Sequence, residues 1–263
     1  MTILFEDSHL LIVNKPAGLT VNRSSTTKDT ETLFDWVERY ASWPLVTSAL
    51  EFNDRCGVVH RLDKETSGAL VIAKDPDTFV ALQKQFKDRT VQKEYTVLVH
   101  GQLDNLSRPG FIVDAPIGRN PRNRFRQAVV ESGRPAVTEF ELRRAAPWGG
   151  STDETVTPPT RPIAVSLLSA YPKTGRMHQI RVHLAALNHP VCGDPVYSPK
   201  NLYKEYTQLL EKNHIDLRMF LHAAKITFTH PVTGKQMTVE APLPPELAQV
   251  LQIYSPTNLD VTP

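Results

Sequence analysis

One short stretch of the chain holds several side chains that could perform chemistry. Residues 58–74 read VVHRLDKETSGALVIAK, so an apolar pair leads into His60, Arg61 and Asp63, and a second apolar run follows Gly68. A carboxylate on a tight loop between rigid elements lies where catalytic groups are often found. An ordinary aspartate is ionised at neutral pH, so Asp63 could act as a nucleophile without a separate base.

The same residues also have a plain structural explanation. Asp and Thr side chains commonly hydrogen-bond the backbone of a turn, so Asp63 or Thr66 could serve only to stabilise this loop. Taken alone, the segment favours the structural explanation over the catalytic one. Other parts of the chain must decide between them.

Several kinds of enzyme are excluded by what the sequence lacks. It contains no GxGxxG motif, no phosphate-binding GxxxxGK motif and no GxSxG motif. The two cysteines, Cys56 and Cys192, belong to no paired motif, and the nine histidines show no metal-ligand spacing. The sequence therefore offers no motif for a nucleotide cofactor and no cysteine-rich zinc site.

The charge pattern gives a weak indication of a nucleic-acid partner. The formal net charge is +2 and the pI is about 8.5, whereas strongly basic domains usually exceed a pI of about 9. Four arginines fall close together with no acid among them: Arg119, Arg122, Arg124 and Arg126. They could contact several phosphates at once or form a solvated basic loop, and composition leaves both open.

Hydrophobic patterns predict the elements that must position these side chains. Strands are predicted over residues 2–5, 9–14, 69–73, 91–100, 137–143, 163–171, 219–229 and 236–240. Helices are predicted near 31–42, after Asp75 and over 176–187. Because strands outnumber helices and often follow one another directly, we expect an α+β fold. It would be a mixed, largely antiparallel β-sheet flanked by helices and loops, with the active-site cleft across the sheet.

Two of the predicted helices carry specific expectations about their side chains. Asp75 should cap the helix that carries Phe79, Leu82 and Phe86 on one face, with Pro76 in its first turn. In the helix over 176–187, Arg181 should lie beside the buried stripe. That stripe would consist of Met177, Ile180, Leu184 and Leu187.

We expect a single catalytic domain over residues 1–263. Residues 147–162 hold four prolines and two glycines, which predicts a loop insertion, and residues 254–263 should form a flexible tail. No apolar run approaches the roughly 20 residues that span a bilayer. The first residues read as a strand and not as a signal peptide, so we expect a cytoplasmic monomer.

Five segments, in order along the chain, resemble the RluA-type pseudouridine synthases. The stretch HRLDKETSG looks like the signature of that family, and EDSHLLIVNKPAGLTV precedes it. It is followed by QKEYTVLVHG, KTGRMHQIRVHLAALNHPVCGDPVY and LHAAKITFTHPVTGK. The resemblance runs from about residue 3 to residue 250. Five ordered matches reverse the balance for Asp63 in favour of catalysis.

The resemblance implies an enzyme that isomerises uridines of ribosomal or transfer RNA to pseudouridine without a cofactor. Asp63 would attack the sugar or otherwise promote cleavage of the glycosidic bond. Tyr95 would pack against the flipped uracil, and Arg181 would form an ion pair with Asp63. Arg61 would enter the RNA stack where the target base has left, since chemistry on a base requires its extrusion.

RNA affinity is expected to come from the catalytic domain itself. Some relatives begin with an appended RNA-binding domain, whereas the first strand is predicted here at residue 2 or 3, so we expect that domain to be absent. The candidate RNA contacts are Lys15, Arg119, Arg122, Arg124 and Arg126.

Each assigned role has an alternative. Arg181 could be an ordinary surface arginine, and Arg61 could contact a phosphate. Tyr95 could be a core tyrosine, although an aromatic wall can be both packed and available for stacking. The whole chain could instead be a non-catalytic RNA-binding module or folding helper. An aspartate-nucleophile hydrolase such as a phosphatase would need a second carboxylate and a metal, and no metal-ligand pattern accompanies Asp63.

Overall fold

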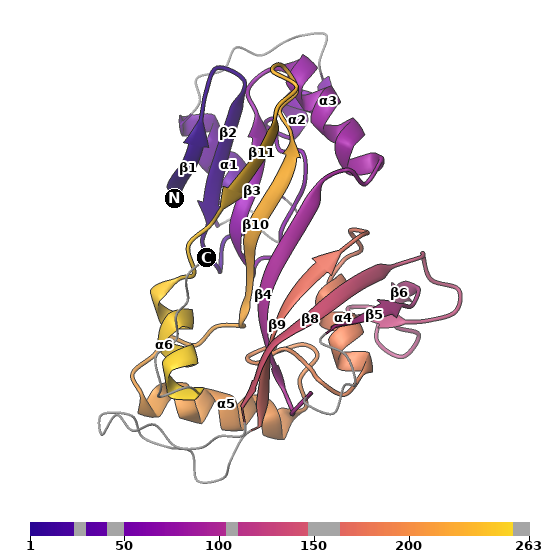
Figure 1. The fold of residues 1–263 in the computed structure, drawn as a ribbon, viewed down its shortest axis with the longest axis vertical. Helices are drawn as coiled ribbons and strands as arrows, with labels where there is room; N and C mark the ends of the chain where they lie inside the picture. The colour runs from indigo at the N-terminus through magenta and orange to yellow at the C-terminus, as the bar shows by residue number, and fades with distance from the viewer. Residues whose placement is uncertain (24–29, 41–49, 104–109, 147–163, 255–263) are drawn as a thin grey trace. The chain divides into compact units, whose positions relative to one another are not determined.

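The described residues form two compact units. The computed structural model describes residues 1–23, 30–40, 50–103, 110–146 and 164–254 (Figure 1). Unit 1 comprises Met1–Glu94 and His222–Pro242, and unit 2 comprises Tyr95–Leu221 and Leu243–Pro263. The predicted loop insertion at 147–162 lies outside the described residues. Both units combine strands and helices, which confirms the expected α+β class.

Unit 1 is a five-stranded sheet with three helices. Four of its strands follow one another across the sheet in the order β1 (Thr2–Glu6), β2 (Leu10–Lys15), β3 (Ser67–Ala73) and β10 (Leu221–Thr229). The fifth strand, β11 (Gln236–Glu240), lies off this path and pairs with β10. Its helices are α1 (Leu33–Tyr40), α2 (Leu50–Asp54) and α3 (Pro76–Lys87). Neighbouring strands are antiparallel except for β3 and β10, which are parallel. The last two predicted strands, over 219–229 and 236–240, are therefore present as β10 and β11 and pair with each other.

Strand β3 is the centre of this unit. All seven of its residues are buried, because β2 and β10 flank it and α3 contributes side chains to the same apolar cluster. Phe79 and Leu82 are buried in that cluster and Phe86 packs against it, as predicted. The carboxylate of Asp75 accepts a hydrogen bond from the Thr78 N–H and so caps α3, also as predicted.

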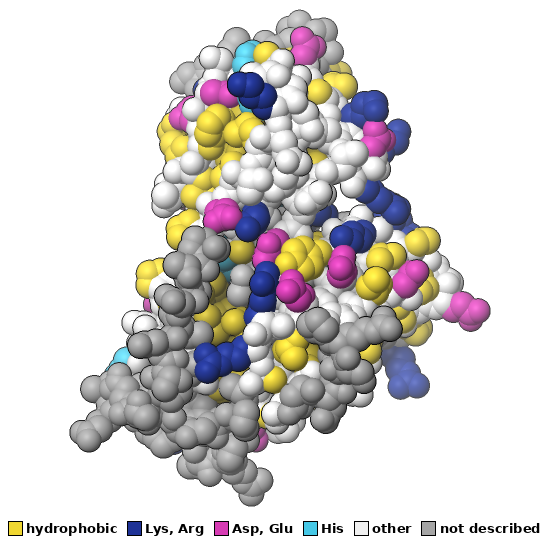
Figure 2. Space-filling view, viewed as in Figure 1, with side chains coloured by type: hydrophobic (Ala, Val, Ile, Leu, Met, Phe, Trp, Pro, Cys, Tyr) yellow, Lys and Arg dark blue, Asp and Glu magenta, His cyan; other side chains and the backbone are white. Residues whose placement is uncertain are grey.

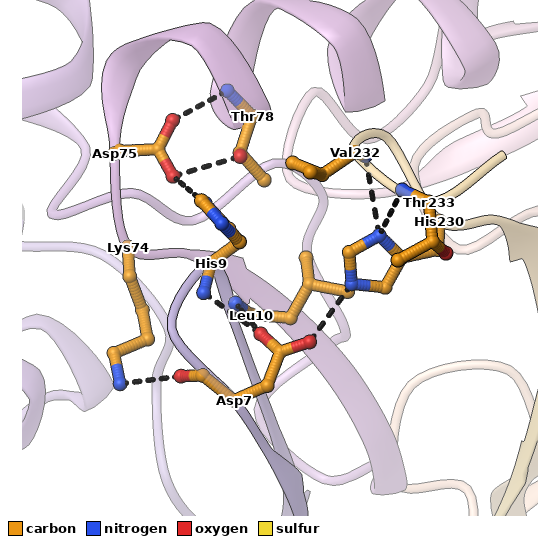
Figure 3. Close-up of polar contacts among 9 residues, drawn as sticks. All are labelled: Asp7, His9, Leu10, Lys74, Asp75, Thr78, His230, Val232 and Thr233. Carbon is orange, nitrogen blue, oxygen red and sulfur yellow. Dashed lines mark hydrogen bonds and ion pairs between the residues drawn. The ribbon is translucent and has the colours of Figure 1, made fainter.

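A network of two Asp–His pairs joins three turns of unit 1 (Figure 3). Asp7, after β1, accepts hydrogen bonds from the backbone N–H groups of His9 and Leu10, and its other oxygen lies 2.8 Å from Nε2 of His230. Nδ1 of His9 lies 2.9 Å from the helix-capping carboxylate of Asp75. The network therefore links the β1–β2 turn to the start of α3 and to the end of β10.

Unit 2 contains a four-stranded antiparallel sheet, a short hairpin and three helices. The strands of the sheet, in spatial order, are β4 (Gln92–His100), β9 (Val165–Pro172), β8 (Val137–Ala146) and β5 (Gly110–Asp114). The hairpin consists of β6 (Ile117–Arg119) and β7 (Gln127–Val129). The helices are α4 (Gln179–Ala186), α5 (Lys200–Lys212) and α6 (Pro245–Tyr254). Strand β4 begins at the end of the first segment of unit 1.

Two apolar clusters account for most of the buried side chains of unit 2. One joins α5 and α6 to Leu98 and Val165 of the sheet. The other joins Ile180 and Leu184 of α4 to residues of β4, β8 and β9. The amphipathic helix predicted over 176–187 is therefore present and packs on the sheet.

The predicted bounds and buried stripe of that helix were partly wrong. Helix α4 begins at Gln179, because His178 adopts a left-handed conformation with φ of 56° and cannot belong to a right-handed helix. Met177 and Leu187 therefore lie outside the helix and are 57% and 41% exposed. The predicted start of the tail at residue 254 is also corrected, because Tyr254 is the buried last residue of α6, and the rest of that tail, residues 255–263, lies outside the described residues.

Candidate active site

Asp63 is half-buried on the loop that connects α2 to β3. Its backbone carbonyl accepts a hydrogen bond from the Thr66 N–H at 3.1 Å, which closes a tight turn. Arg61, two residues earlier on the same loop, is exposed. The prediction of a carboxylate on a tight loop at the edge of a buried strand is confirmed. Contacts on three sides hold this loop in place.

The first contact comes from a buried lysine. Lys15 has no exposed surface, and its Nζ donates hydrogen bonds to the carbonyls of Pro16, Leu19 and Lys64 at 2.8, 2.8 and 3.1 Å. Three carbonyls can satisfy the three donors of an ammonium group, which makes burial of the charge tolerable. We therefore correct the expectation that Lys15 contacts RNA, since phosphates do not reach a side chain inside the fold.

The hydrogen bonds of Lys15 bear directly on the position of Asp63. The Lys64 carbonyl follows Asp63 in the chain and also accepts the Gly18 N–H at 2.9 Å. This one carbonyl is therefore fixed twice, by a side chain and by a backbone group of the segment after β2. Hydrogen bonds therefore hold the lysine–proline segment against the loop of Asp63, although Lys15 and Lys64 are 49 residues apart in the chain.

The second contact holds the loop at its N-terminal end. Nε2 of His60 accepts a hydrogen bond from the Val71 N–H at 3.0 Å, and its ring stacks on Phe86 with centroids 4.7 Å apart. Burial, together with the nearby positive charges of Lys93 and Arg55, lowers the pKa of His60 to about 3. A neutral ring whose Nε2 accepts must carry its proton on Nδ1.

The third contact lies at the C-terminal end of the loop. The Oγ of Ser67 lies 2.8 Å from Nδ1 of His222, whose Nε2 lies 3.1 Å from the Ala241 carbonyl. Because a carbonyl can only accept, Nε2 carries the proton and Nδ1 accepts from the serine hydroxyl. Next to this pair, Gly68 has φ of +122°, and a Cβ there would lie 2.2 Å from the Ala223 carbonyl oxygen. Strand β3 thus starts in close contact with β10.

In unit 2, Arg181 is held in a bidentate ion pair. Its Nε and Nη2 lie 2.7 and 2.9 Å from the two carboxylate oxygens of Asp194, and the arginine is only 4% exposed. The Tyr197 ring lies against the guanidinium, with the Cζ atom 5.1 Å from its centroid. The alternative of an ordinary surface arginine is therefore wrong.

Asp194 and Tyr197, which both contact Arg181, are themselves held by further hydrogen bonds. One oxygen of Asp194 also accepts the N–H groups of Val196 and Tyr197, at 2.8 and 3.1 Å. The Tyr197 hydroxyl accepts the Gln127 N–H at 3.0 Å, at the start of β7, and lies 2.9 Å from Nδ1 of His178. Sequence reasoning did not single out Asp194 or Tyr197. The signal was present in the segment GDPVY, where an acid and an aromatic residue follow a glycine.

The remaining candidate residues also lie in unit 2. Tyr95 is half-buried on β4 and packs against the apolar cluster of α4 and the sheet, so it is in part a core residue. Four candidates belong to the β6–β7 hairpin and all are exposed: Arg119, Arg122, Arg124 and Arg126. On the face shown in Figure 2, basic and acidic side chains are interspersed, so this acid-free run is a local feature.

Each unit brings together part of the predicted site. Unit 1 holds Asp63 and Arg61 on one loop, and unit 2 holds Tyr95 and Arg181. The expected ion pair between Asp63 and Arg181 stays a prediction. Among the residues that the structure describes, no three His, Cys, Asp or Glu side chains come together as a metal site would require. Within those same residues, no helix has the length and apolarity to cross a membrane.

The fold and the site define an α+β protein with a carboxylate fixed on a rigid loop, and comparison with known proteins gives its family. A family profile described as RNA pseudouridylate synthase matches residues 9–186. Ribosomal large subunit pseudouridine synthase D of Nitrosomonas europaea is 39% identical over 255 residues, which cover 96% of this chain and 64% of that protein. The chain therefore belongs to the RNA pseudouridylate synthase family, whose members are isomerases acting on RNA.

Further relatives extend this comparison. Ribosomal large subunit pseudouridine synthase D of Xanthomonas campestris pv. campestris is 36% identical over 263 residues, covering 95% of this chain and 68% of that protein. An uncharacterised RNA pseudouridine synthase of Mycobacterium tuberculosis is 35% identical, covering 96% and 72%. The chain spans less than two thirds of the length of the Nitrosomonas protein.

Solved structures support the fold. Human RNA pseudouridylate synthase domain containing 4 has a TM-score of 0.65 at 23% identity, and the match covers 96% of this chain and 92% of the human chain. Human RNA pseudouridylate synthase domain containing 1 has a TM-score of 0.64 at 24% identity, covering 94% and 85%. This likeness concerns the arrangement of the strands and helices.

Proposed function

We propose that this chain isomerises selected uridines of large-subunit ribosomal RNA to pseudouridine, with Asp63 as the catalytic carboxylate and without a cofactor. Membership of the family supports the reaction class. The names of the Nitrosomonas and Xanthomonas relatives support ribosomal RNA of the large subunit over transfer RNA as the substrate. The observation that carries the proposal is the loop of Asp63, which hydrogen bonds fix at three places while Asp63 itself is half-buried.

The proposed reaction exchanges one bond to the ribose for another. The bond from C1′ to N1 of uracil breaks, the base turns, and C1′ forms a bond to C5. The proton on C5 leaves and N1 gains one, so atoms and electrons balance without a redox partner. Asp63 promotes the cleavage, either by attacking the sugar or by abstracting a proton. A fixed carboxylate suits either variant, because orientation is a large part of catalysis.

The other site residues contact the target uracil, the carboxylate of Asp63 and the RNA phosphates. The target uridine leaves the RNA stack, which costs a few kcal/mol of stacking and pairing. Arg61 fills the gap by stacking and hydrogen bonding, and Tyr95 packs against the extruded uracil. Arg181 pairs with Asp63 and fixes the orientation of its carboxylate. Arginines of the β6–β7 hairpin bind phosphates.

Release of tritium from C5 of uridine tests the assignment of Asp63. RNA labelled at C5 loses tritium when the base rejoins the sugar through that carbon. We expect Asp63→Asn to reduce release by roughly a thousandfold or more while RNA binding persists. The matched control is Asp54→Asn, which removes an exposed carboxylate from the end of α2 in the same unit.

The other outcomes separate the alternatives. Retained release by the Asp63→Asn variant would remove Asp63 from its role. RNA binding by the native chain without any tritium release would favour a non-catalytic RNA-binding module. Release from transfer RNA but not from large-subunit ribosomal RNA would keep the reaction and change the substrate.

A further inference from the structure

The tip of the β6–β7 hairpin exposes a large aromatic side chain. Phe125 is 93% exposed, the highest fraction among the large hydrophobic side chains that the structure describes. Burying a phenylalanine side chain is favourable, and the folded chain gains almost none of this free energy at Phe125. A single exposed hydrophobic residue is common on protein surfaces, so the surroundings must show whether this one has a partner.

The residues around Phe125 are basic. Arg124 and Arg126 flank it, Arg122 lies on the same tip, and all three are exposed. The chain carries no acid between Asp114 and Glu131. An aromatic ring interleaved with arginines is the pattern by which proteins hold single-stranded nucleic acids, because bases stack on the ring while guanidinium groups bind phosphates. The core of a protein–protein interface, in contrast, is depleted of charged residues.

The hairpin tip is held in one conformation by its own side chains. Oδ1 of Asn120 accepts the N–H groups of Arg122 and Asn123, at 2.8 and 3.2 Å. Oδ1 of Asn123 accepts the Phe125 N–H at 3.1 Å, and the Asn120 N–H donates to the Arg126 carbonyl at 2.9 Å. A tip that is ordered before binding loses less conformational entropy when it binds, so the backbone that carries Phe125 is preorganised for a ligand.

The base of the same hairpin is hydrogen-bonded to Tyr197, which contacts Arg181. The N–H of Gln127, two residues after Phe125, donates to the hydroxyl of Tyr197. The ring of Tyr197 lies against the guanidinium of Arg181. Within unit 2, a base held at the tip would therefore be positioned by the same elements that position Arg181.

We infer that Phe125 is a stacking platform for an unpaired nucleobase of the RNA substrate, with Arg122, Arg124 and Arg126 binding the adjoining phosphates. This inference rests on the proposed function for the choice of RNA. The stacked base is a neighbour of the target uridine, which is assigned to Tyr95. The contact gives the protein a preference for RNA that has an unpaired base near the target uridine. A fully paired duplex offers no free ring face to Phe125.

Three variants of Phe125 test the inference by equilibrium binding without turnover. The probes are an RNA hairpin with a single-stranded loop and a fully paired duplex of the same length. Phe125→Leu keeps an apolar side chain but removes the π-face, Phe125→Ala removes both, and Phe125→Trp keeps an aromatic ring. We expect the Leu and Ala variants to bind the hairpin RNA about 5- to 150-fold more weakly. The Trp variant should bind as the native chain does, and duplex affinity should be unchanged in all three.

Fluorescence gives a second and independent measurement. The added indole of Phe125→Trp should be quenched by the hairpin RNA beyond any change seen in the native chain, and the duplex should not quench it. Equal affinity of the native and Leu variants for the hairpin would overturn the inference, as would equal losses on hairpin and duplex. Because Phe125 makes little contact with the fold, unchanged thermal unfolding should accompany every variant.

The binding result is separable from the proposed function. If the native chain binds the hairpin RNA through Phe125 but releases no tritium, the stacking platform stands and the isomerase proposal fails. If tritium release depends on Asp63 while the Leu variant keeps native affinity and native KM, the isomerase proposal stands and the platform fails. If both hold, the Leu variant should raise KM and leave kcat unchanged at saturating RNA.

Discussion

At the scale of single residues, two cations are buried in hydrogen-bond networks, although lysine and arginine side chains are usually exposed. Lys15 gives its three donors to backbone carbonyls, one of which belongs to the residue after Asp63. Arg181 is bidentate to Asp194. Both use their charge inside the protein, so their first effect is on the position of other groups.

Lys15→Met should distinguish a positioning residue from an RNA contact. The change leaves buried carbonyls without a donor, so we expect a loss of about 1–3 kcal/mol in the free energy of unfolding. Turnover should fall because the loop of Asp63 loses one support. The dependence of RNA affinity on salt should not change, since no phosphate contact is lost. Denaturant unfolding and RNA binding at several salt concentrations would measure this, with exposed Lys87→Met of α3 as control.

A smaller salt dependence in the Lys15→Met variant, together with native stability, would contradict the positioning role. That result would restore the RNA contact that the sequence alone predicted.

At the scale of elements, β3 connects the loop of Asp63 to the core of unit 1. Its apolar sequence predicts a buried strand, and the structure adds that its first residues pair in parallel with His222 and Ala223 of β10. That close approach depends on Gly68, because its φ of +122° and its contact with Ala223 leave no room for a side chain. The start of β3, directly after the loop of Asp63, thus depends on one glycine.

Gly68→Ala should destabilise the protein more than another glycine substitution in the same unit. The added Cβ meets backbone atoms and a positive φ, so we expect a loss of roughly 2–5 kcal/mol. The matched control is Gly234→Ala, which has a φ of +68° but open space around the Cβ, and should lose only about 1 kcal/mol. Urea unfolding of both variants measures the difference. Equal losses would show that the contact with Ala223 is not close.

The elements that sequence reasoning found are those with strong local signals. The apolar run of β3 and the Asp75 cap of α3 appear as predicted, because both depend on neighbouring residues. The start of α4 was misplaced, because the left-handed conformation of His178 has no signature in its neighbours. Helices α5 and α6 were not predicted, although their buried residues form a large part of one apolar cluster.

At the scale of the whole molecule, each unit is completed by a chain segment that returns from far along the sequence. Residues 222–242 add β10 and β11 to unit 1, and residues from 243 onward add α6 to unit 2. The Ser67–His222 hydrogen bond spans 155 positions. Several titratable groups are fixed in these structures, so the stability of the molecule should depend on pH.

Stability should fall as the pH is lowered from about 6.5 toward 3. His60 has its pKa lowered to about 3 by burial and by nearby positive charges, whereas an unfolded histidine titrates near 6.5. The unfolded state therefore binds more protons in this window, which destabilises the folded state as the pH falls. Burial also lowers the pKa of His100, to about 4, so His60 accounts for only part of the slope.

A second loss should follow at lower pH. Burial by itself raises the pKa of Asp7 and of Asp75. Hydrogen bonds outweigh this effect: His230 donates to Asp7, and Thr78 and His9 donate to Asp75. Both pKa values therefore lie below the ordinary value of an aspartate. Their contribution is present above about pH 4 and is lost as the pH falls through the folded-state values.

Urea unfolding of native chain and His60→Gln at pH 7, 5 and 4 checks the first window. Glutamine can still accept from the Val71 N–H and does not titrate, so the variant should show a shallower decline between pH 6.5 and 4. A decline of equal slope in both proteins would show that His60 is not held neutral by the fold.

The sequence by itself determined the local features and the family. Caps, apolar runs and short motifs depend on residues near one another in the chain, and five ordered motifs identify relatives without any coordinates. The tertiary structure alone decided where Lys15 donates its hydrogen bonds, which carboxylate holds Arg181 and where Phe125 is presented to solvent. Burial and hydrogen-bond partners arise when distant segments come together, and residue type and local spacing do not specify them.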